Sequence, residues 1–160
     1  MLELPHTAGC LVCGRENPRG LRLSLRVDPD KGLVTTHFTP NELHIGFEGI
    51  IHGGVIATVL DEAMVWAATW KGRRFCVCGE LTVRFRNAVK PGDELRIEAF
   101  VEFSRPKLVE CASKVFDRTG RLLATGSGKY VPMTAEQHKA MTNTLVDEPS
   151  TFQSAAILRS

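Results

Sequence analysis

The sequence contains no run of about 18 apolar residues, the length that a helix needs to cross a bilayer. Its charges nearly balance, because 20 Lys and Arg stand against 18 Asp and Glu and leave a net charge of +2. This surplus gives no argument for binding to nucleic acid. The N-terminus, MLELPHTAGC, also lacks the charged lead and the apolar core of a secretory signal. We therefore expect a cytoplasmic protein that binds neither membranes nor nucleic acid.

Cysteines are few and odd in number, five in all, which argues against a disulfide framework in a chain without an export signal. Cys10 and Cys13 form a CxxC pair, half of a zinc knuckle, and Cys76 and Cys78 would have to supply the other half. This second pair is badly spaced, because alternate residues of a strand lie about 6 to 7 Å apart. We expect reduced thiols that pack as small apolar side chains, and no metal. A zinc-stabilised interaction module built on Cys10 and Cys13 is kept as an alternative.

Local patterns predict most of the secondary structure. Alternation predicts a hairpin of strands at 21–27 and 33–38 around the turn DPDKG, whereas Pro40 and several glycines prevent a regular helix before residue 53. From Val55 to about Trp70 the period becomes helical, with apolar residues around most of the circumference, so this helix should be buried centrally. Four long strands follow at 75–89, 94–104, 107–117 and 121–132, and their short connections favour antiparallel pairing.

This order predicts an α+β fold in which one antiparallel sheet wraps around one long central helix. A single sheet leaves an edge or a face uncovered, and dimerisation ordinarily covers it. The segment 134–145 is expected to form a short helix capped by Thr134. The residues after 147 should form a loose tail. We therefore expect a turn-rich lead-in at 1–20, one domain at 21–133, and a short helix with a tail at 134–160.

The stretch GIIHGGVIATVLDEAM, residues 49–64, places His52, Gly53 and Gly54 directly before the predicted helix and Asp61 and Glu62 within it. With the strand GELTVRFRNAVKPGD and the order of elements, it resembles the hotdog-fold thioesterases, in their phenylacetyl-CoA and acyl-CoA thioesterase branch. The resemblance covers roughly residues 20–132. It implies hydrolysis of an acyl-CoA thioester by an aspartate at the position of Asp61, with coenzyme A as part of the substrate and no other cofactor.

Thioester hydrolysis passes through an oxyanion, so a site needs backbone donors on one side of the carbonyl and a base or nucleophile on the other. Gly53 and Gly54 open the helix, where unpaired amides and the positive end of the dipole meet, and Gly53 is the expected oxyanion donor. His52 is expected to cap the helix, orient the loop or touch the thioester. Asp61 would activate water or attack the thioester, and the sequence leaves both routes open. Glu62, about 100° away around the helix, is expected to be solvated or ion-paired.

The spacing of these groups predicts a dimer. Gly53 and Asp61 lie about 12 Å apart along one helix, at a rise of 1.5 Å per residue, yet both must lie about 3 Å from one reacting centre. If two central helices pair antiparallel, the glycine end of one meets the Asp61 region of the other, and two-fold symmetry creates two equal sites. We expect a homodimer; whether two dimers form a homotetramer stays open.

Further residues are expected around the substrate. Many members of the resembled family have Asn or Gln six residues before the histidine, where this chain has Gly46. Either Glu48 or His44 substitutes for it, or no residue does. Near Cys78 they often have Ser or Thr to hold the water, and cysteine is the poorer donor. We expect an enzyme that hydrolyses a medium-chain or aromatic acyl-CoA. Because of the two departures, a non-catalytic acyl-CoA binding or sensing protein is kept as the alternative. A hotdog dehydratase is disfavoured, since those enzymes generally arrange histidine and acid differently.

The two ends of the substrate make different demands. Phe47, Val65 and Trp66 are expected at the acyl chain. The phosphates of coenzyme A require a basic rim. Its candidates follow the helix on the next turn and strands: Arg73, Arg74, Arg84, Arg86, Lys90, Arg105 and Lys107.

Overall fold

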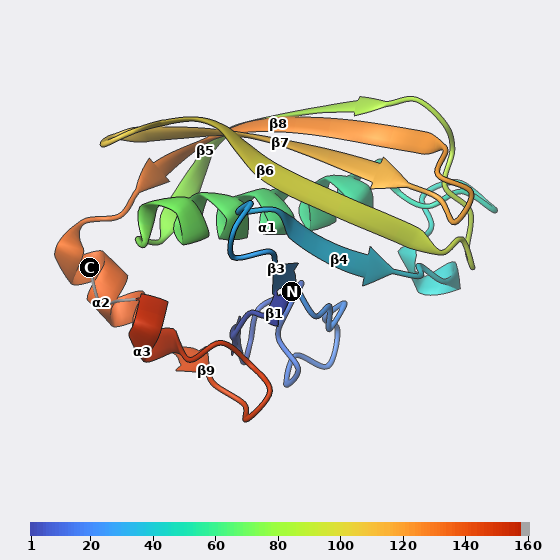
Figure 1. The fold of residues 1–160 in the computed structure, drawn as a ribbon. Helices are drawn as coiled ribbons and strands as arrows, with labels where there is room; N and C mark the ends of the chain where they lie inside the picture. The colour runs from blue at the N-terminus through green and yellow to red at the C-terminus, as the bar shows by residue number, and fades with distance from the viewer. Residues whose placement is uncertain (158–160) are drawn as a thin grey trace.

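A computed structural model describes residues 1–157 and shows one antiparallel sheet arched over a single long helix, α1 (Figure 1). Within these residues the sheet has seven strands in the order β1-β3-β4-β6-β7-β8-β5. The strands are β1 Leu2–Glu3, β3 Arg26–Val27, β4 Val34–Phe38, β5 Cys76–Phe85, β6 Leu95–Arg105, β7 Leu108–Phe116 and β8 Leu122–Pro132. A separate pair joins β2 (His6–Thr7) to β9 (Leu145–Val146). The predicted sheet around one central helix is confirmed.

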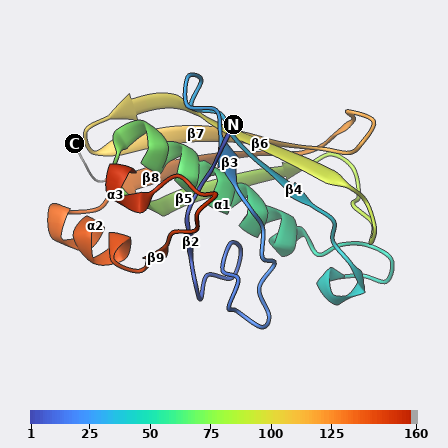
Figure 2. The same cartoon turned by 60° about the horizontal axis from the view of Figure 1, so that its bottom comes forward.

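Helix α1 spans Gly53–Gly72, two residues more at each end than the hydrophobic period predicts. It begins where the His52 side chain caps it, and it ends at Arg73, whose φ of 52° is left-handed. Leu60 and Met64 are fully buried beneath the sheet, which contacts the helix mainly through β6 and β7. Turned by 60°, the molecule shows the helix lying along the face of the sheet (Figure 2). Among residues 1–157, no helix combines the length and the apolarity of a bilayer span.

The prediction of a first strand at 21–27 is mostly wrong, because only the last two of these residues form β3. Arg22 has a φ of 55°, which interrupts the extended backbone. The amide of Leu23 donates to the carbonyl of Val12 at 2.8 Å, so it bonds to the lead-in and not to a sheet neighbour. Burial still alternates along this segment, so the pattern identified the buried face while the hydrogen bonds went elsewhere.

The long strands lie close to their predicted bounds, except that β5 stops at Phe85 instead of 89. Beyond it, the amides of Arg86 and Asn87 both donate to the carbonyl of Leu123, which ends the ladder with β8. The predicted C-terminal helix is α2, Ala135–Thr142, and Thr134 caps it as expected.

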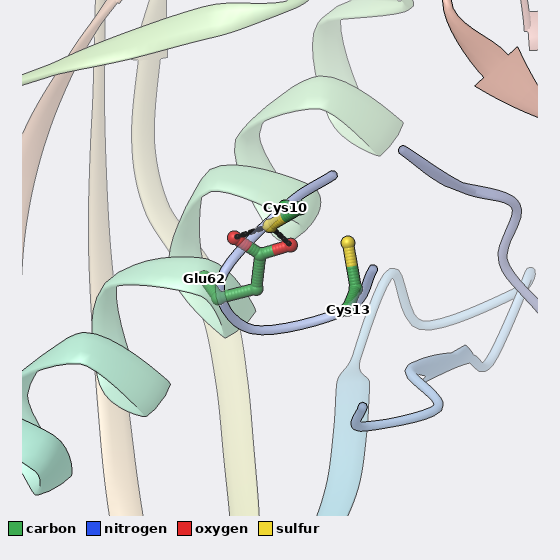
Figure 3. Close-up of side chains that lie close together, drawn as sticks. All are labelled: Cys10, Cys13 and Glu62. Carbon is green, nitrogen blue, oxygen red and sulfur yellow. Dashed lines mark hydrogen bonds between the residues drawn. The ribbon is translucent and has the colours of Figure 1, made fainter. Parts of the chain in front are cut away.

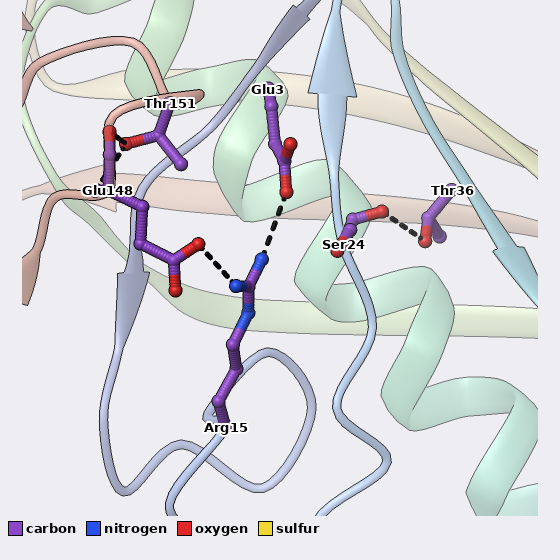
Figure 4. A network of polar contacts seen from close by, with 6 residues as sticks. All are labelled: Glu3, Arg15, Ser24, Thr36, Glu148 and Thr151. Atoms are coloured by element: carbon purple, nitrogen blue, oxygen red, sulfur yellow. Dashed lines mark hydrogen bonds and ion pairs between the residues drawn. The ribbon is translucent and has the colours of Figure 1, made fainter.

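The expected loose tail is instead attached to the domain. Arg15 of the lead-in donates to Glu3 at 3.0 Å and pairs with Glu148, as Figure 4 shows. The ring of Phe152 packs edge-on against Trp70 of α1 at 5.1 Å. The short helix α3, Ser154–Ile157, follows. The prediction is therefore wrong up to residue 157, because apolar and charged contacts with distant segments hold the tail; residues 158–160 lie outside the described part.

Candidate functional site

The N-terminus of α1 presents one free backbone donor. The Nδ1 atom of His52 accepts a hydrogen bond from the amide of Gly54 at 2.8 Å, so His52 caps the helix and occupies that amide. Because Nδ1 accepts, the proton of a neutral imidazole lies on Nε2, which has no acceptor among residues 1–157. Among residues 1–157, the amide of Gly53 has no acceptor. A Cβ at Gly53 would lie 3.1 Å from the ring of Phe85, so a side chain here would crowd that ring.

A cavity of about 400 Å³ lies beside this end of the helix. Gly46 and Phe47 line it together with Gly53, as expected, but Glu48 does not. Residues 85–89 form the opposite wall. Most of this lining is apolar, which suits an acyl group.

Neither Glu48 nor His44 takes the place of the polar side chain that relatives have at the position of Gly46. A Cβ at Gly46 would meet the His52 ring at 3.1 Å, so the loop passes close to the capping histidine. The Nδ1 atom of His44 accepts from the amide of Asn41 at 3.0 Å and closes the short helix η1, Glu42–His44. His44 therefore serves the loop and does not line the cavity.

Asp61 lies on α1 beneath β8 and β5. Its Oδ1 accepts a hydrogen bond of 2.8 Å from the hydroxyl of Tyr130, which is fully buried. Burial and the nearby Asp61 raise the pKa of Tyr130, so the hydroxyl keeps its proton and donates. Cys78 stands opposite Tyr130 in the β5–β8 register, and partial burial and then Asp61 raise the pKa of its thiol. The structure thus places Cys78 near Asp61 and next to Tyr130, a tyrosine that sequence reasoning missed.

A signal for Tyr130 was present in the sequence. It is the only tyrosine of the chain and sits at an inward position of β8. Gly128, two residues before it on the same face, leaves space for the ring, because a Cβ there would lie 2.6 Å from it.

Glu62 points away from Asp61, as their angle on the helix predicts, but it is only partly exposed and forms no ion pair among the described residues. It accepts a hydrogen bond of 3.2 Å from the indole of Trp66 and lies beside Cys10. Glu62 and Cys10 line a second cavity, of about 200 Å³. Trp66 and Val65, which were expected at the acyl chain, line this second cavity and not the one at Gly53. The expectation failed because these residues lie on a different face of the helix.

The basic candidates divide by their contacts. Arg86 lines the cavity at Gly53, and Arg84 is exposed on β5. Arg73 instead stacks on Trp70 with its guanidinium carbon 4.0 Å from the ring centre, and Arg105 stacks on an exposed phenylalanine of β6. These last two cations therefore contribute to packing.

Within one chain, the free amide and the carboxylate do not share a site. Asp61 does not line the cavity at Gly53, about two helical turns away. Beside Asp61, a stripe of small residues, Gly54, Ala57 and Thr58, is only partly covered on α1. Next to this stripe, β5 is the edge of the sheet. It carries exposed apolar side chains, with Val77 49%, Leu81 36% and Phe85 54% exposed. This arrangement leaves exposed apolar side chains beside an unpaired strand edge.

Comparison with known proteins identifies the fold. Residues 48–124 match the family model of the thioesterase superfamily. The solved thioesterase superfamily protein RHA08564 aligns at 23% identity with a TM-score of 0.71, over 76% of this chain and 62% of its own, less than two thirds of its length. The Escherichia coli PaaI protein from the phenylacetic acid degradation operon aligns at 19% identity with a TM-score of 0.65, over 71% and 80%.

A third solved structure carries a ligand. The protein smu.793 of Streptococcus mutans, bound to acetyl CoA, aligns at 17% identity with a TM-score of 0.65, over 69% of this chain and 88% of its own. At these identities the structural likeness shows the hotdog fold, as predicted. No curated protein sequence matches the chain.

Proposed function

We propose that this chain is an acyl-CoA thioesterase of the thioesterase superfamily, whose family model matches residues 48–124. The observation that carries the proposal is the Gly53 amide at the start of α1, which has no acceptor among residues 1–157 and opens on a largely apolar cavity of about 400 Å³. A helix N-terminus directs both the amide and the dipole at developing negative charge. Gly53 then stabilises the oxyanion of a thioester, and the apolar wall holds its acyl group.

The carboxylate comes from a second copy of the chain. Antiparallel pairing of two α1 helices along Gly54, Ala57 and Thr58 covers the exposed stripe and carries the Asp61 of one chain to the Gly53 end of the other. Small residues allow this close approach. Pairing of the two β5 edges satisfies their free backbone groups and covers Leu81 and Phe85. The assembly we propose is a homodimer with two equal sites, and dimers of dimers are compatible with it.

At this shared site, each residue has a defined part. Asp61 acts as base for a water or as nucleophile toward the thioester carbon, and Gly53 and the Nε2 of His52 face the carbonyl oxygen. Tyr130 fixes one oxygen of Asp61 and leaves the other free to react. We propose coenzyme A at the rim by Arg84 and Arg86, and a medium-chain or aromatic acyl group against Phe47. The acetyl CoA bound by smu.793 supports this ligand class.

The test of the function is thiol release from a panel of acyl-CoA thioesters, short, medium, long and phenylacetyl. We expect saturable release that is fastest for medium or aromatic acyl groups. Binding of the same thioesters without release of thiol would contradict the proposed thioesterase activity. That result would select the alternative, an acyl-CoA binding or sensing protein, which the weak donor Cys78 beside Asp61 favours.

Tyr130→Phe separates positioning from binding. The change removes only the donor to Asp61 and leaves the ring in place, so the carboxylate loses its fixed orientation. We expect kcat to fall about tenfold, the lower range for a hydrogen bond to a charged group, with KM nearly unchanged. Steady-state kinetics of both proteins, with a melting curve to show that the variant is folded, provide the measurement. An unchanged kcat would remove Tyr130 from this role.

A further inference from the structure

The lead-in touches the centre of α1 through three potential metal ligands. The sulfurs of Cys10 and Cys13 and a carboxylate oxygen of Glu62 all lie within 4.8 Å of one another. Figure 3 shows the two thiols coming from one loop and the carboxylate from the helix, turned toward the same small space. The lead-in and Glu62 lie 49 to 52 residues apart in the sequence, so local spacing did not reveal the third ligand. The four-cysteine set considered from the sequence is not brought together, since Cys78 lies beside Asp61.

The distances suit tetrahedral zinc. With Zn–S near 2.3 Å and Zn–O near 2.1 Å, a tetrahedral angle separates sulfur from oxygen by about 3.6 Å. The sulfur of Cys10 lies 3.7 and 3.8 Å from the two oxygens of Glu62. Small side-chain rotations therefore suffice to place an ion between the three groups.

The loop is already shaped to hold the first sulfur. The amide of Val12 donates to the sulfur of Cys10 at 3.3 Å, and the amide of Gly14 donates to the carbonyl of Cys10 at 3.0 Å. Gly14 has to be glycine in this turn, because a Cβ would lie 2.4 Å from the Cys10 carbonyl oxygen. A backbone amide that donates to a sulfur favours its thiolate form, the form that binds metal.

Among residues 1–157, no Lys or Arg pairs with Glu62, although its carboxylate is only partly exposed and lies against Cys10. A carboxylate that is partly removed from water is costly without a counter-ion. A divalent cation held between this carboxylate and the two sulfurs would supply one.

We propose that Cys10, Cys13 and Glu62 bind one zinc ion whose fourth ligand is a water in the adjoining cavity. Two thiolates select zinc over the hard cations. The cavity of about 200 Å³ has room for the water, and the buried hydroxyl of Thr69 on its wall has no partner among the described residues. Cys76 lines the same cavity, but its thiol contacts the carbonyl of Arg74 at 3.5 Å and stays outside the cluster. The ion cross-links the lead-in to the middle of α1 and so stabilises the fold.

Metal analysis of the full chain, purified without chelators and kept reduced, tests the site directly. We expect close to one zinc per chain. Stripping with a chelator should lower the melting temperature, and added zinc should restore it. Refilling with cobalt should produce the thiolate charge-transfer absorption of a tetrahedral sulfur site. None of these readouts depends on thioesterase activity, so this proposal and the proposed function can fail separately.

Glu62→Gln keeps the shape of the side chain and removes the charged ligand. It should remain folded by circular dichroism and weaken zinc affinity more than about tenfold, the least that even an outer contact of a metal site costs. Cys78→Ser, a cysteine change outside the cluster, should retain the full zinc content. Reduced wild-type protein that contains no zinc and takes none up would overturn the proposal. Equal zinc affinity in Glu62→Gln and the wild type would overturn it as well.

Discussion

Asp61→Asn is expected to lower kcat for thioester hydrolysis by roughly 10²- to 10⁴-fold, the usual contribution of a catalytic base, or more if Asp61 is the nucleophile. The amide has nearly the same shape and can still accept the hydrogen bond from Tyr130, but it can neither take a proton from water nor attack the carbonyl. Affinity for the acyl-CoA should stay within a few fold, because the change keeps the shape of the side chain and leaves the apolar lining of the cavity at Gly53 intact. Thiol release and equilibrium binding, measured on the same preparations, give both quantities.

The matched control is Asp30→Asn, which removes an exposed carboxylate from the turn between β3 and β4. It should leave hydrolysis unchanged. If Asp61→Asn is as active as this control, Asp61 has no part in the chemistry.

Leu81→Glu is expected to convert the dimer into monomers and to remove most activity at low protein concentration. Leu81 lies near the middle of the β5 edge, where the proposed partner strand would bury it. An unpaired charge buried at such a position costs several kcal/mol of association energy. In the monomer it stays 36% exposed, so the fold should tolerate the change. Analytical ultracentrifugation gives the mass, and assays over a range of protein concentrations show whether activity follows the dimer.

Phe103→Glu provides the comparison for this variant. Phe103 is also a partly exposed apolar residue, 42% exposed, but it lies on β6, three strands away from β5. The Phe103→Glu protein should remain dimeric and active. A monomeric Leu81→Glu protein with full activity would show that one chain carries a complete site.

The sequence predicted the elements whose pattern is local and long. Helix α1 follows from the spacing of its apolar residues, and β6, β7 and β8 lie within about a residue of their predicted bounds. The predictions fail where contacts between residues far apart in the sequence determine the local structure. Residues 21–25 alternate like a strand but bond to the lead-in, and the tail after 147 is held by Arg15 and Trp70, far away in the sequence. No local pattern reveals such partners.

The candidate site divides in the same way. The glycines at the start of α1 and the divergence of Asp61 from Glu62 follow from helix geometry, and the structure has both. Helix geometry does not predict the hydrogen-bond partners of Asp61 and Glu62. Tyr130 lies 69 residues after Asp61 and Cys10 lies 52 residues before Glu62, so only the fold brings them together. The sequence therefore predicts a solvated or ion-paired Glu62, whereas burial in the fold raises its pKa to about 7.

The most direct measurement of the shared site is complementation between two inactive variants. Asp61→Asn keeps its Gly53 amide, and Gly53→Val keeps its Asp61 while its side chain blocks the oxyanion position beside Phe85. Mixed in equal amounts and allowed to exchange subunits, half of the dimers contain one chain of each kind, and each such dimer has one intact site. The account predicts recovery of about one quarter of wild-type activity. If both variants exchange subunits and the mixture stays as inactive as its components, each site is built within a single chain and the account is wrong.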